Sequence, residues 1–482
     1  MIRTRKNNDK LLIGILLFIA FFLAKLPILN MPIHWDAIQQ IVVADRLKSN
    51  NLNPESLRNF WIYEGRPLFF YELLALSYLL LGVSLWVPHL LIIIFGFIAL
   101  YFTYLLGENL YSKKVGIIAS LFLFFSAIFF AQTGIVTLMV PFTALTLTTL
   151  YFAIKNRIKA YLISGTLLVM TLDIAPLLIL LILFYVIYRN HKKEKIKNIL
   201  LYSIPLFVFV LWMTYNKLVF GWFLFTRVSS FPNIVESWPL VIGILPLIEN
   251  FVNRLQEVFI YDYKWILTVP LILLSVHKIA NRKFSVKLEI VFLFSVILSY
   301  LLSFSLMKEG YLIRYALMVY PLFFLLVSNS LNEIVKNKLA INLIVIIIII
   351  LFVSTWVGNR TENCGCKLES NLEYLDLVKT HYETTNYIEK NYPNLTVLTA
   401  WPQTEELSMP ILGYVSKPIK IIPIYHPNLT EKMFGADLVY YSPQSDLYQE
   451  QMLLDIMKNL NLTLLTKFEQ NGKYTEIYRI KK

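Results

Sequence analysis

Uncharged apolar runs recur along most of this chain, and they constrain its fold more than any other feature. Two examples are "LLIIIFGFIALYFTYLL" at residues 90–106 and "LAINLIVIIIIILFVSTWV" at residues 339–357. As helices, such runs are long enough to cross about 30 Å of hydrocarbon. Charged residues make up only 16% of the chain, whereas a soluble protein carries about 25%. The sequence therefore predicts a polytopic α-helical membrane protein.

Eleven segments have the length and composition of membrane-spanning helices. We place them near residues 11–28, 84–106, 115–132, 141–154, 160–172, 174–187, 198–220, 264–279, 287–306, 315–333 and 339–357. If the N-terminus is cytoplasmic, the loops on that side are "GENLYSKK", "KNRIK", "YRNHKKEKIKN", "HKIANRKFSVK" and "NEIVKNK". Every one of these loops is basic, as the positive-inside rule requires. The alternation places residues 358–482 outside and predicts a multi-pass protein of the plasma membrane.

A further apolar segment, residues 67–82, is not counted as a span. It is short and carries Glu72 in its first half, and counting it would move the basic loops to the outer face. We expect it to lie along the outer interface, within a large external loop at residues 29–83. The two segments between residues 160 and 187 could instead form one long bent helix.

The net charge of +13 does not indicate nucleic-acid binding, because of where the charges lie. Residues 1–357 hold 31 basic and 16 acidic side chains, and residues 358–482 hold 13 and 15. The whole excess therefore belongs to the membrane part, where basic loops are expected. Basic residues from Arg3 to Lys10 precede the first apolar run, and no small-residue cleavage site follows it. We expect an uncleaved first helix rather than a signal peptide.

Residues 358–482 have a different pattern and predict a soluble α/β domain. Helices are expected at 371–393 and 445–461, and strands at 395–401, 419–425, 437–442, 462–469 and 475–480, where β-branched and aromatic residues gather. Four N-x-[ST] sequons fit an external location of this part, at Asn359, Asn394, Asn428 and Asn461. The two cysteines, Cys364 and Cys366, are too few for a four-ligand zinc site and predict a local disulfide or two free thiols.

One acidic residue lies just beyond the first span, in the stretch "HWDAIQQIVVADRL" at residues 34–47. A carboxylate at the position of Asp36 can serve as a general base, or help to hold a divalent cation against a phosphate. It could equally be a solvated loop residue or the N-cap of the following helix.

Two other external stretches carry charges that suit an anionic ligand. Glu64 and Arg66 come directly before the interfacial segment. The fork of an arginine bonds two phosphate oxygens at once, although an arginine at an interface also extends to lipid headgroups without a specific ligand. Lys308, Glu309 and Arg314 lie in a short turn between two late spans, where Arg314 points either into a cavity or toward the headgroups.

Three stretches resemble, in this order, those of one family. They are "HWDA" after the first helix, "GRPLFFYELLALSYLLLG" later in the same loop, and "IRYALMVYP" leading into a late helix. They look like the protein O-mannosyltransferase and aminoarabinose-transferase group of GT-C-type glycosyltransferases, over about residues 10–330. A "WWDxG" stretch does not occur, which argues against an oligosaccharyltransferase.

The resemblance implies a transferase that takes a sugar from a polyprenyl-phosphate donor at the outer face. The acceptor would displace the lipid phosphate directly at the sugar C1, with inversion of configuration. The acceptor would be a protein, a lipid or a glycan. Asp36 would match the acid that activates the acceptor or binds a divalent cation such as Mg, Mn or Zn. Glu64 lies close to an acid that some members have.

The same resemblance assigns the basic residues. Arg66, Arg314 and Lys308 would face the phosphate of the lipid donor. His34 and Tyr315, which neighbour these motifs, are expected to support the site. When cationic side chains offset its negative charge, the lipid phosphate becomes a good leaving group.

The chain departs from the family at three places. Ala37 stands where many members have a second acid, the second external loop "QTGIVTLMVPF" has no charge, and Pro67 stands where two prolines are usual. An enzyme with an altered acceptor site and a catalytically degenerate member both fit these departures. The alternative from another class is a transporter or flippase, for which Asp173 is the clearest mid-membrane charge. Eleven spans are more than the anchor of an adhesion protein needs.

Overall fold

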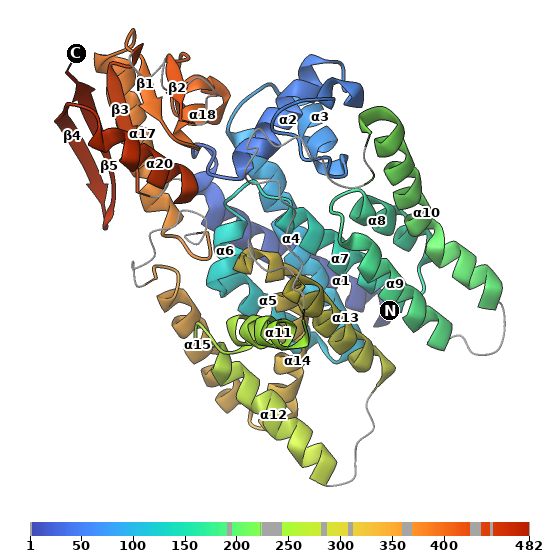
Figure 1. Cartoon of the computed structure of the whole chain (residues 1–482). Coiled ribbons are helices and arrows are strands. Elements are labelled where there is room, and N and C mark those ends of the chain that lie inside the picture. Colours follow the sequence, from blue (N-terminus) through green and yellow to red (C-terminus); the bar gives the residue numbers. More distant parts are fainter. Residues whose placement is uncertain are drawn as a thin grey trace.

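The computed structural model describes residues 2–189, 195–221, 223, 243–280, 287–306, 312–358, 369–424, 435–443 and 447–481. It consists of a large helical body with a small sheet at one end. Figure 1 shows the sheet on the same side of the helical body as α2 and α3, the two helices of the first loop. Helix α4 lies in the middle of the body and packs against α5 and α7.

The helical body contains the apolar segments that the sequence predicts as spans. Its helices are α1 (Ile2–Lys25), α4 (Trp86–Leu110), α5 (Lys113–Phe125), α6 (Ala127–Gln132), α7 (Met139–Ile154), α8 (Ile158–Val169), α9 (Ala175–Arg189), α10 (Lys195–Phe220), α11 (Ile244–Phe259), α12 (Lys264–Ala280), α13 (Leu288–Ser305), α14 (Val319–Ile334) and α15 (Lys338–Ser354). A 3₁₀ helix, η3 (Ile313–Met318), leads into α14. Ten of the eleven predicted segments each overlap one of these α-helices, and the segment at 115–132 covers both α5 and α6.

The helices differ in length. Among the described residues, five are long and apolar enough to cross a membrane: Asn8–Ile28, Trp86–Leu110, Ile196–Phe220, Leu288–Ser305 and Ile313–Ile334. Helices α11 and α12 meet at 101° and could form a sixth, bent crossing. Four further predicted spans, α7, α8, α9 and α15, are apolar helices of 12 to 17 residues. The chain is a multi-pass membrane protein, and its eleven crossings stay a prediction.

Two parts of the body differ from the expectation. The segment predicted as one span at 115–132 is broken at Ser126, whose backbone is extended between α5 and α6. The Ser126 hydroxyl donates to Leu123 O at 2.9 Å, an alternative to helical bonding that serine often takes. Helix α11 is not among the predicted elements, because charged and polar residues interrupt its apolar positions.

The first loop holds α2 (Ala37–Ser49), the 3₁₀ helix η2 (Pro54–Leu57) and α3 (Phe69–Leu81), and it follows the 3₁₀ helix η1 (Leu26–Ile28) at the end of the first span. Helix α3 occupies the segment predicted as interfacial. One of its faces is buried through Phe70, Tyr71 and Leu74, whereas Leu79 and Leu80 are exposed. Such a half-exposed apolar helix suits a membrane interface.

The C-terminal part is an α/β unit whose five strands and two longer helices follow the predicted pattern. Helices α17 (Tyr374–Asn391), α18 (Gln403–Ser408) and α20 (Leu447–Lys458) accompany β1 (Val397–Thr399), β2 (Ile421–Pro423), β3 (Leu438–Tyr441), β4 (Leu462–Gln470) and β5 (Lys473–Ile480). A 3₁₀ turn, η4 (Pro410–Leu412), follows α18, and neither this turn nor the short helix α18 was predicted. The strand order is β2-β1-β3-β5-β4. Strands β1, β2 and β3 are parallel, and β5 is antiparallel to both of its neighbours.

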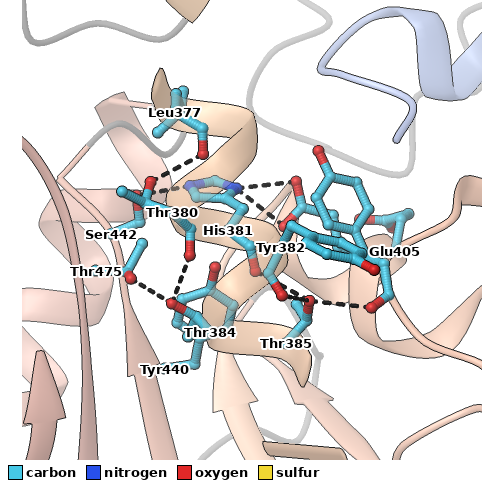
Figure 2. A network of polar contacts seen from close by, with 12 residues as sticks. Leu377, Thr380, His381, Tyr382, Thr384, Thr385, Glu405, Tyr440, Ser442 and Thr475 are labelled. Carbon is cyan, nitrogen blue, oxygen red and sulfur yellow. Dashed lines mark hydrogen bonds and ion pairs between the residues drawn. The ribbon is translucent and has the colours of Figure 1, made fainter. Parts of the chain in front are cut away.

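A buried polar network fixes α17 on this unit (Figure 2). His381 Nδ1 lies 3.0 Å from both carboxylate oxygens of Glu406, and His381 Nε2 lies 3.1 Å from Ser442 Oγ. Thr384 bonds Thr475 of β5. These groups are almost fully buried, and buried polar side chains need such partners. The network therefore joins α17 to α18, to Ser442 directly after β3, and to β5.

The helical body and the C-terminal unit share one apolar core. Tyr374, Leu377 and Leu412 of the C-terminal unit belong to the same buried cluster as the residues of α2, α4 and α7. The division of the chain at residues 357 and 358 stays a prediction. Several predicted features lie outside the described residues: Lys193, Lys283, Lys308, Glu309, Asn359, Cys364, Cys366 and Asn428.

Candidate active site

A pocket at the first loop brings together residues that are far apart in the sequence. It is lined by Asp36, Gln39, Gln40, Glu64, Arg66, Thr137, Leu138, Met139, Arg314 and Tyr315. Five of these ten were predicted as site residues from the sequence. They come from the start of α2, from the segment before α3, and from η3.

Asp36 immediately precedes α2, but it does not act as a helix cap. Its side chain makes no capping hydrogen bond and forms an ion pair with Arg314 instead. The Asp36 side chain is 40% exposed, whereas that of Arg314 is 4% exposed, so the carboxylate keeps a free side toward the pocket. Trp35 before it has a φ of +46°, a left-handed backbone that a bulky residue rarely adopts. Such strain is often found beside functional groups.

Arg314 is held from two sides. Its Nη2 pairs with Asp36, and its Nη1 pairs with Glu369 from the C-terminal part. The Glu369 side chain is 1% exposed. No sequence motif marks Glu369, because its pair with Arg314 depends on how the C-terminal unit docks.

Arg66 and Glu64 form a second, more local ion pair. Arg66 Nε and Nη2 lie 2.9 Å and 2.8 Å from the same oxygen of Glu64. Between them Gly65 has a φ of +79°, which glycine adopts without strain and which lets the two side chains turn toward each other. Tyr63 Oη donates to Arg66 O at 2.7 Å, and Asn216 Nδ2 donates to Gly65 O at 3.3 Å. The turn is thus anchored to α10.

Asp173 is near the site rather than in the middle of a span. It lies in the turn between α8 and α9, and Met170 O of this turn accepts a hydrogen bond from Phe69 N at 3.0 Å. Burial raises the pKa of Asp173 to about 7, with Arg66 opposing and Glu64 adding to the effect. A carboxyl group that titrates near neutrality beside a guanidinium is a candidate for a functional group.

The two supporting residues take different places. Tyr315 lines the pocket, and its ring stacks on Phe304 at 5.5 Å. His34 is buried and is not part of the lining; it stacks on Tyr374 at 5.7 Å. Burial lowers the pKa of His34 to about 3, with His381 and Arg314 adding to the effect, so the ring is neutral at physiological pH.

The described part of the chain does not show a metal site. Among the described residues, no group of three or more His, Cys, Asp or Glu side chains is placed to hold a metal ion. The metal role of Asp36 stays a prediction, and its carboxylate pairs with Arg314.

Comparison with known proteins gives one family match. Residues 65–216 match the family model of dolichyl-phosphate-mannose-protein mannosyltransferase. This range covers about a third of the chain and includes Arg66 and Asp173. No curated protein matches.

Solved structures match almost the whole chain. ArnT from Cupriavidus metallidurans in the apo state has a TM-score of 0.57 at 12% identity, over 96% of this chain and 97% of that one. ArnT bound to undecaprenyl phosphate has a TM-score of 0.56 at the same identity and coverage. The archaeal oligosaccharyltransferase AglB from Archaeoglobus fulgidus, with an inhibitory peptide and a dolichol-phosphate, has a TM-score of 0.56 at 10% identity, over 98% and 74%.

The chain has the GT-C fold. This result confirms the predicted fold class, with a helical membrane body and a small C-terminal sheet. It also confirms the resemblance to polyprenyl-phosphate-sugar transferases of the GT-C type. A further structure of the Archaeoglobus fulgidus oligosaccharyltransferase, a complex with Zn and sulfate, matches this GT-C chain with a TM-score of 0.52 at 10% identity, over 88% and 68%.

Proposed function

We propose that this GT-C protein is a membrane glycosyltransferase that moves a sugar from a polyprenyl-phosphate donor to an acceptor at the outer face. The observation that carries the proposal is the pocket, in which Asp36 and Arg66 face one small space. An acid that can accept a proton and an arginine that can bind a phosphate are the two groups that such a transfer needs. The family match and the ligands of ArnT and AglB support the lipid-phosphate donor.

In the proposed reaction, Asp36 acts as the general base. The acceptor hydroxyl gives its proton to a carboxylate oxygen of Asp36 while its oxygen forms a bond to the sugar C1. The bond from C1 to the phosphate oxygen breaks, and the electron pair leaves with the lipid phosphate. Attack and departure on opposite faces of C1 give inversion of configuration.

The arginines offset the charge of the leaving group. A phosphodiester donor carries one negative charge, and the released lipid phosphate gains a second as the bond breaks. We assign Arg66 as the main phosphate ligand, because its guanidinium pairs with one carboxylate and is 20% exposed. Arg314 lines the same pocket, and two of its five N–H donors face carboxylates, so others remain for the phosphate. Glu64 is proposed as an auxiliary acid that sets the position of Arg66.

The sugar and the acceptor are proposed as classes. We propose a hexosyl or pentosyl donor, with mannose as the first to test because of the matched family. A protein acceptor comes first, since AglB is solved with a peptide. We further propose that the N-terminus is cytoplasmic and that the pocket and the C-terminal part are extracytoplasmic, as the basic loops indicate.

The test of this function is an assay with purified protein in detergent. The protein is incubated with short-chain polyprenyl phosphates that carry mannose, another hexose or a pentose, together with a mixture of acceptor peptides. Release of the lipid phosphate, dependent on the acceptor, is the expected result. Binding without release for every donor would favour the transporter or degenerate enzyme. Cysteine labelling of intact cells tests the orientation: a C-terminal part that reacts only after lysis would contradict it.

A further inference from the structure

Glu369 is a residue of the C-terminal part that reaches the candidate active site. Its carboxylate pairs with Nη1 of Arg314, whose Nη2 pairs with Asp36. The three side chains therefore form one row in which Arg314 is the middle member. Inferences about this row rest on the proposed function, because they concern how the proposed base is held.

The backbone of Glu369 is fixed as firmly as its side chain. Gln132 Nε2 donates to Glu369 O at 3.0 Å, and Gln132 Oε1 accepts from Thr137 Oγ1 at 3.1 Å. Gln132 is fully buried, and Thr137 lines the pocket. Nearby, Leu372 N donates to Trp356 O at 2.8 Å at the end of α15. The position of Glu369 is thus set by groups of the membrane body.

The segment that carries Asp36 also contacts the C-terminal part directly. Ile33 N donates to Leu412 O at 2.9 Å, and the rings of Trp35 and Trp401 meet edge to face at 4.7 Å. Tyr374, at the start of α17, stacks on His34. A side chain at Gly134 would lie 2.4 Å from the Tyr374 hydroxyl, so glycine is needed for this approach.

The pair between Glu369 and Arg314 is not one that an incoming ligand would readily displace. Glu369 and Arg314 are 1% and 4% exposed. Removal of one member of a buried pair leaves the other charged and without solvent, so Glu369 does not readily give up Arg314 to an incoming phosphate. The polar network of Figure 2 holds α17 on the sheet and keeps the segment before it in one place.

We propose that Glu369 is a positioning residue for transfer: it holds Arg314 so that Arg314 in turn orients the Asp36 carboxylate toward the pocket. The C-terminal part is then a component of the catalytic unit rather than an appended module. Glu369 itself touches neither donor nor acceptor. Its loss should therefore change the chemical step far more than donor binding, since Arg66, the main phosphate ligand, is unaffected and Arg314 still pairs with Asp36.

The experiment uses full-length protein with the variants Glu369→Gln and Glu373→Gln. Glu373 lies on the same segment and is equally buried, but it faces Lys473 at 3.5 Å instead of the site. We expect Glu369→Gln to lower kcat by about 10- to 100-fold, because small displacements of a catalytic group have such effects. The KM for the lipid donor should stay within about two-fold of wild type. Glu373→Gln should leave kcat per folded molecule unchanged. An unchanged kcat in Glu369→Gln, or an equal loss in both variants, would overturn the proposal.

A second measurement does not depend on activity. Asp36→Asn leaves Arg314 with Glu369, and Glu369→Gln leaves it with Asp36, whereas the double variant leaves a buried arginine without either carboxylate. The thermal shift of the double variant should thus exceed the sum of the two single shifts. Additive shifts would show that the three side chains are not one unit. If wild type transfers no sugar while the shifts are coupled, the proposed function fails and the row remains as a structural unit without a catalytic role.

Discussion

The candidate site contains two arginine–carboxylate clusters that differ in almost every respect. Arg66 and Glu64 are two residues apart, and Glu64 is 54% exposed. Arg314 joins Asp36 and Glu369, which are far apart in the sequence, and both its own side chain and that of Glu369 are buried. Water screens the first cluster and lets its partners exchange, whereas the second exists only once the fold is complete. The first therefore suits a ligand that comes and goes, and the second suits a group that must stay in place.

The largest expected effect is on the base of the buried cluster. Asp36→Asn should lower transfer by about 10²–10⁴-fold, because a neutral amide cannot accept the proton. Donor affinity should stay close to wild type, because Arg66 and Glu64 are unchanged. Kinetics and donor binding are measured on the same preparation. Asp45→Asn is the control, since Asp45 also lies on α2 but pairs with Lys48 at 3.0 Å, away from the pocket. Near-normal turnover of Asp36→Asn would remove its catalytic assignment.

The second effect is a difference in how much the two arginines contribute to the free energy of unfolding. Arg314→Ala leaves Asp36 and the buried Glu369 without their shared cation, and we expect it to cost about 3–5 kcal/mol of unfolding free energy. Arg66→Ala frees a half-exposed carboxylate and should cost about 1 kcal/mol or less. Thermal unfolding in the same detergent compares the two. Similar losses would mean that the difference in burial has no energetic consequence.

The third effect concerns the exposed cluster and the ligand. Arg66→Ala should weaken donor binding by about 10- to 100-fold, the range for a lost hydrogen bond to a charged group. Arg66→Lys should recover only part of this affinity, because lysine offers a point charge in place of a fork. Binding is measured with a short-chain polyprenyl phosphate. If both variants bind as wild type does, Arg66 is not the phosphate ligand.

The smallest effect is a pH dependence at Asp173, beside the exposed cluster. Burial raises the pKa of Asp173 to about 7, with Arg66 opposing and Glu64 adding to the effect, so the group is mostly neutral below pH 7 and negative above it. The negative form competes with a phosphate for Arg66. Donor affinity should thus fall by about two- to five-fold as the pH rises from 6 to 8, a range typical of partly screened charges. Asp173→Asn should keep the higher affinity across this range. A wild-type affinity that does not change with pH would contradict the assignment.

Much of the fold could be predicted from residue patterns, because those patterns act over short distances. Runs of apolar residues marked the helices, and β-branched residues marked β1 to β5. Three features were not predicted: the break at Ser126, whose hydroxyl bonds the preceding turn, helix α11, which mixes charged with apolar positions, and the short helix α18.

For the candidate site as well, local sequence patterns identify single residues, whereas contacts between distant residues require the structure. Asp36, Glu64 and Arg66 could be selected from one loop and its resemblance to a family, and Arg314 from a second motif. Their partnership could not, because Asp36 and Arg314 are 278 residues apart and meet only through packing. Glu369 carried no signal at all, since its role depends on the docking of the C-terminal part. Asp173 was noticed as an isolated charge in an apolar region, but its nearness to Arg66 required the structure.

The shared core between the first loop and the C-terminal part has a consequence for the order of synthesis. A ribosome releases the segment with Asp36 long before it makes Glu369, Tyr374 and Leu412. Until those residues arrive, Arg314 has Asp36 but lacks its second carboxylate, and the segment at His34 and Trp35 lacks its contacts with the C-terminal part. All residues that line the pocket are therefore translated before the contacts that hold Arg314 and this segment in place. We expect copies that end before Glu369 to contain the pocket residues without the arrangement that the C-terminal part imposes on them.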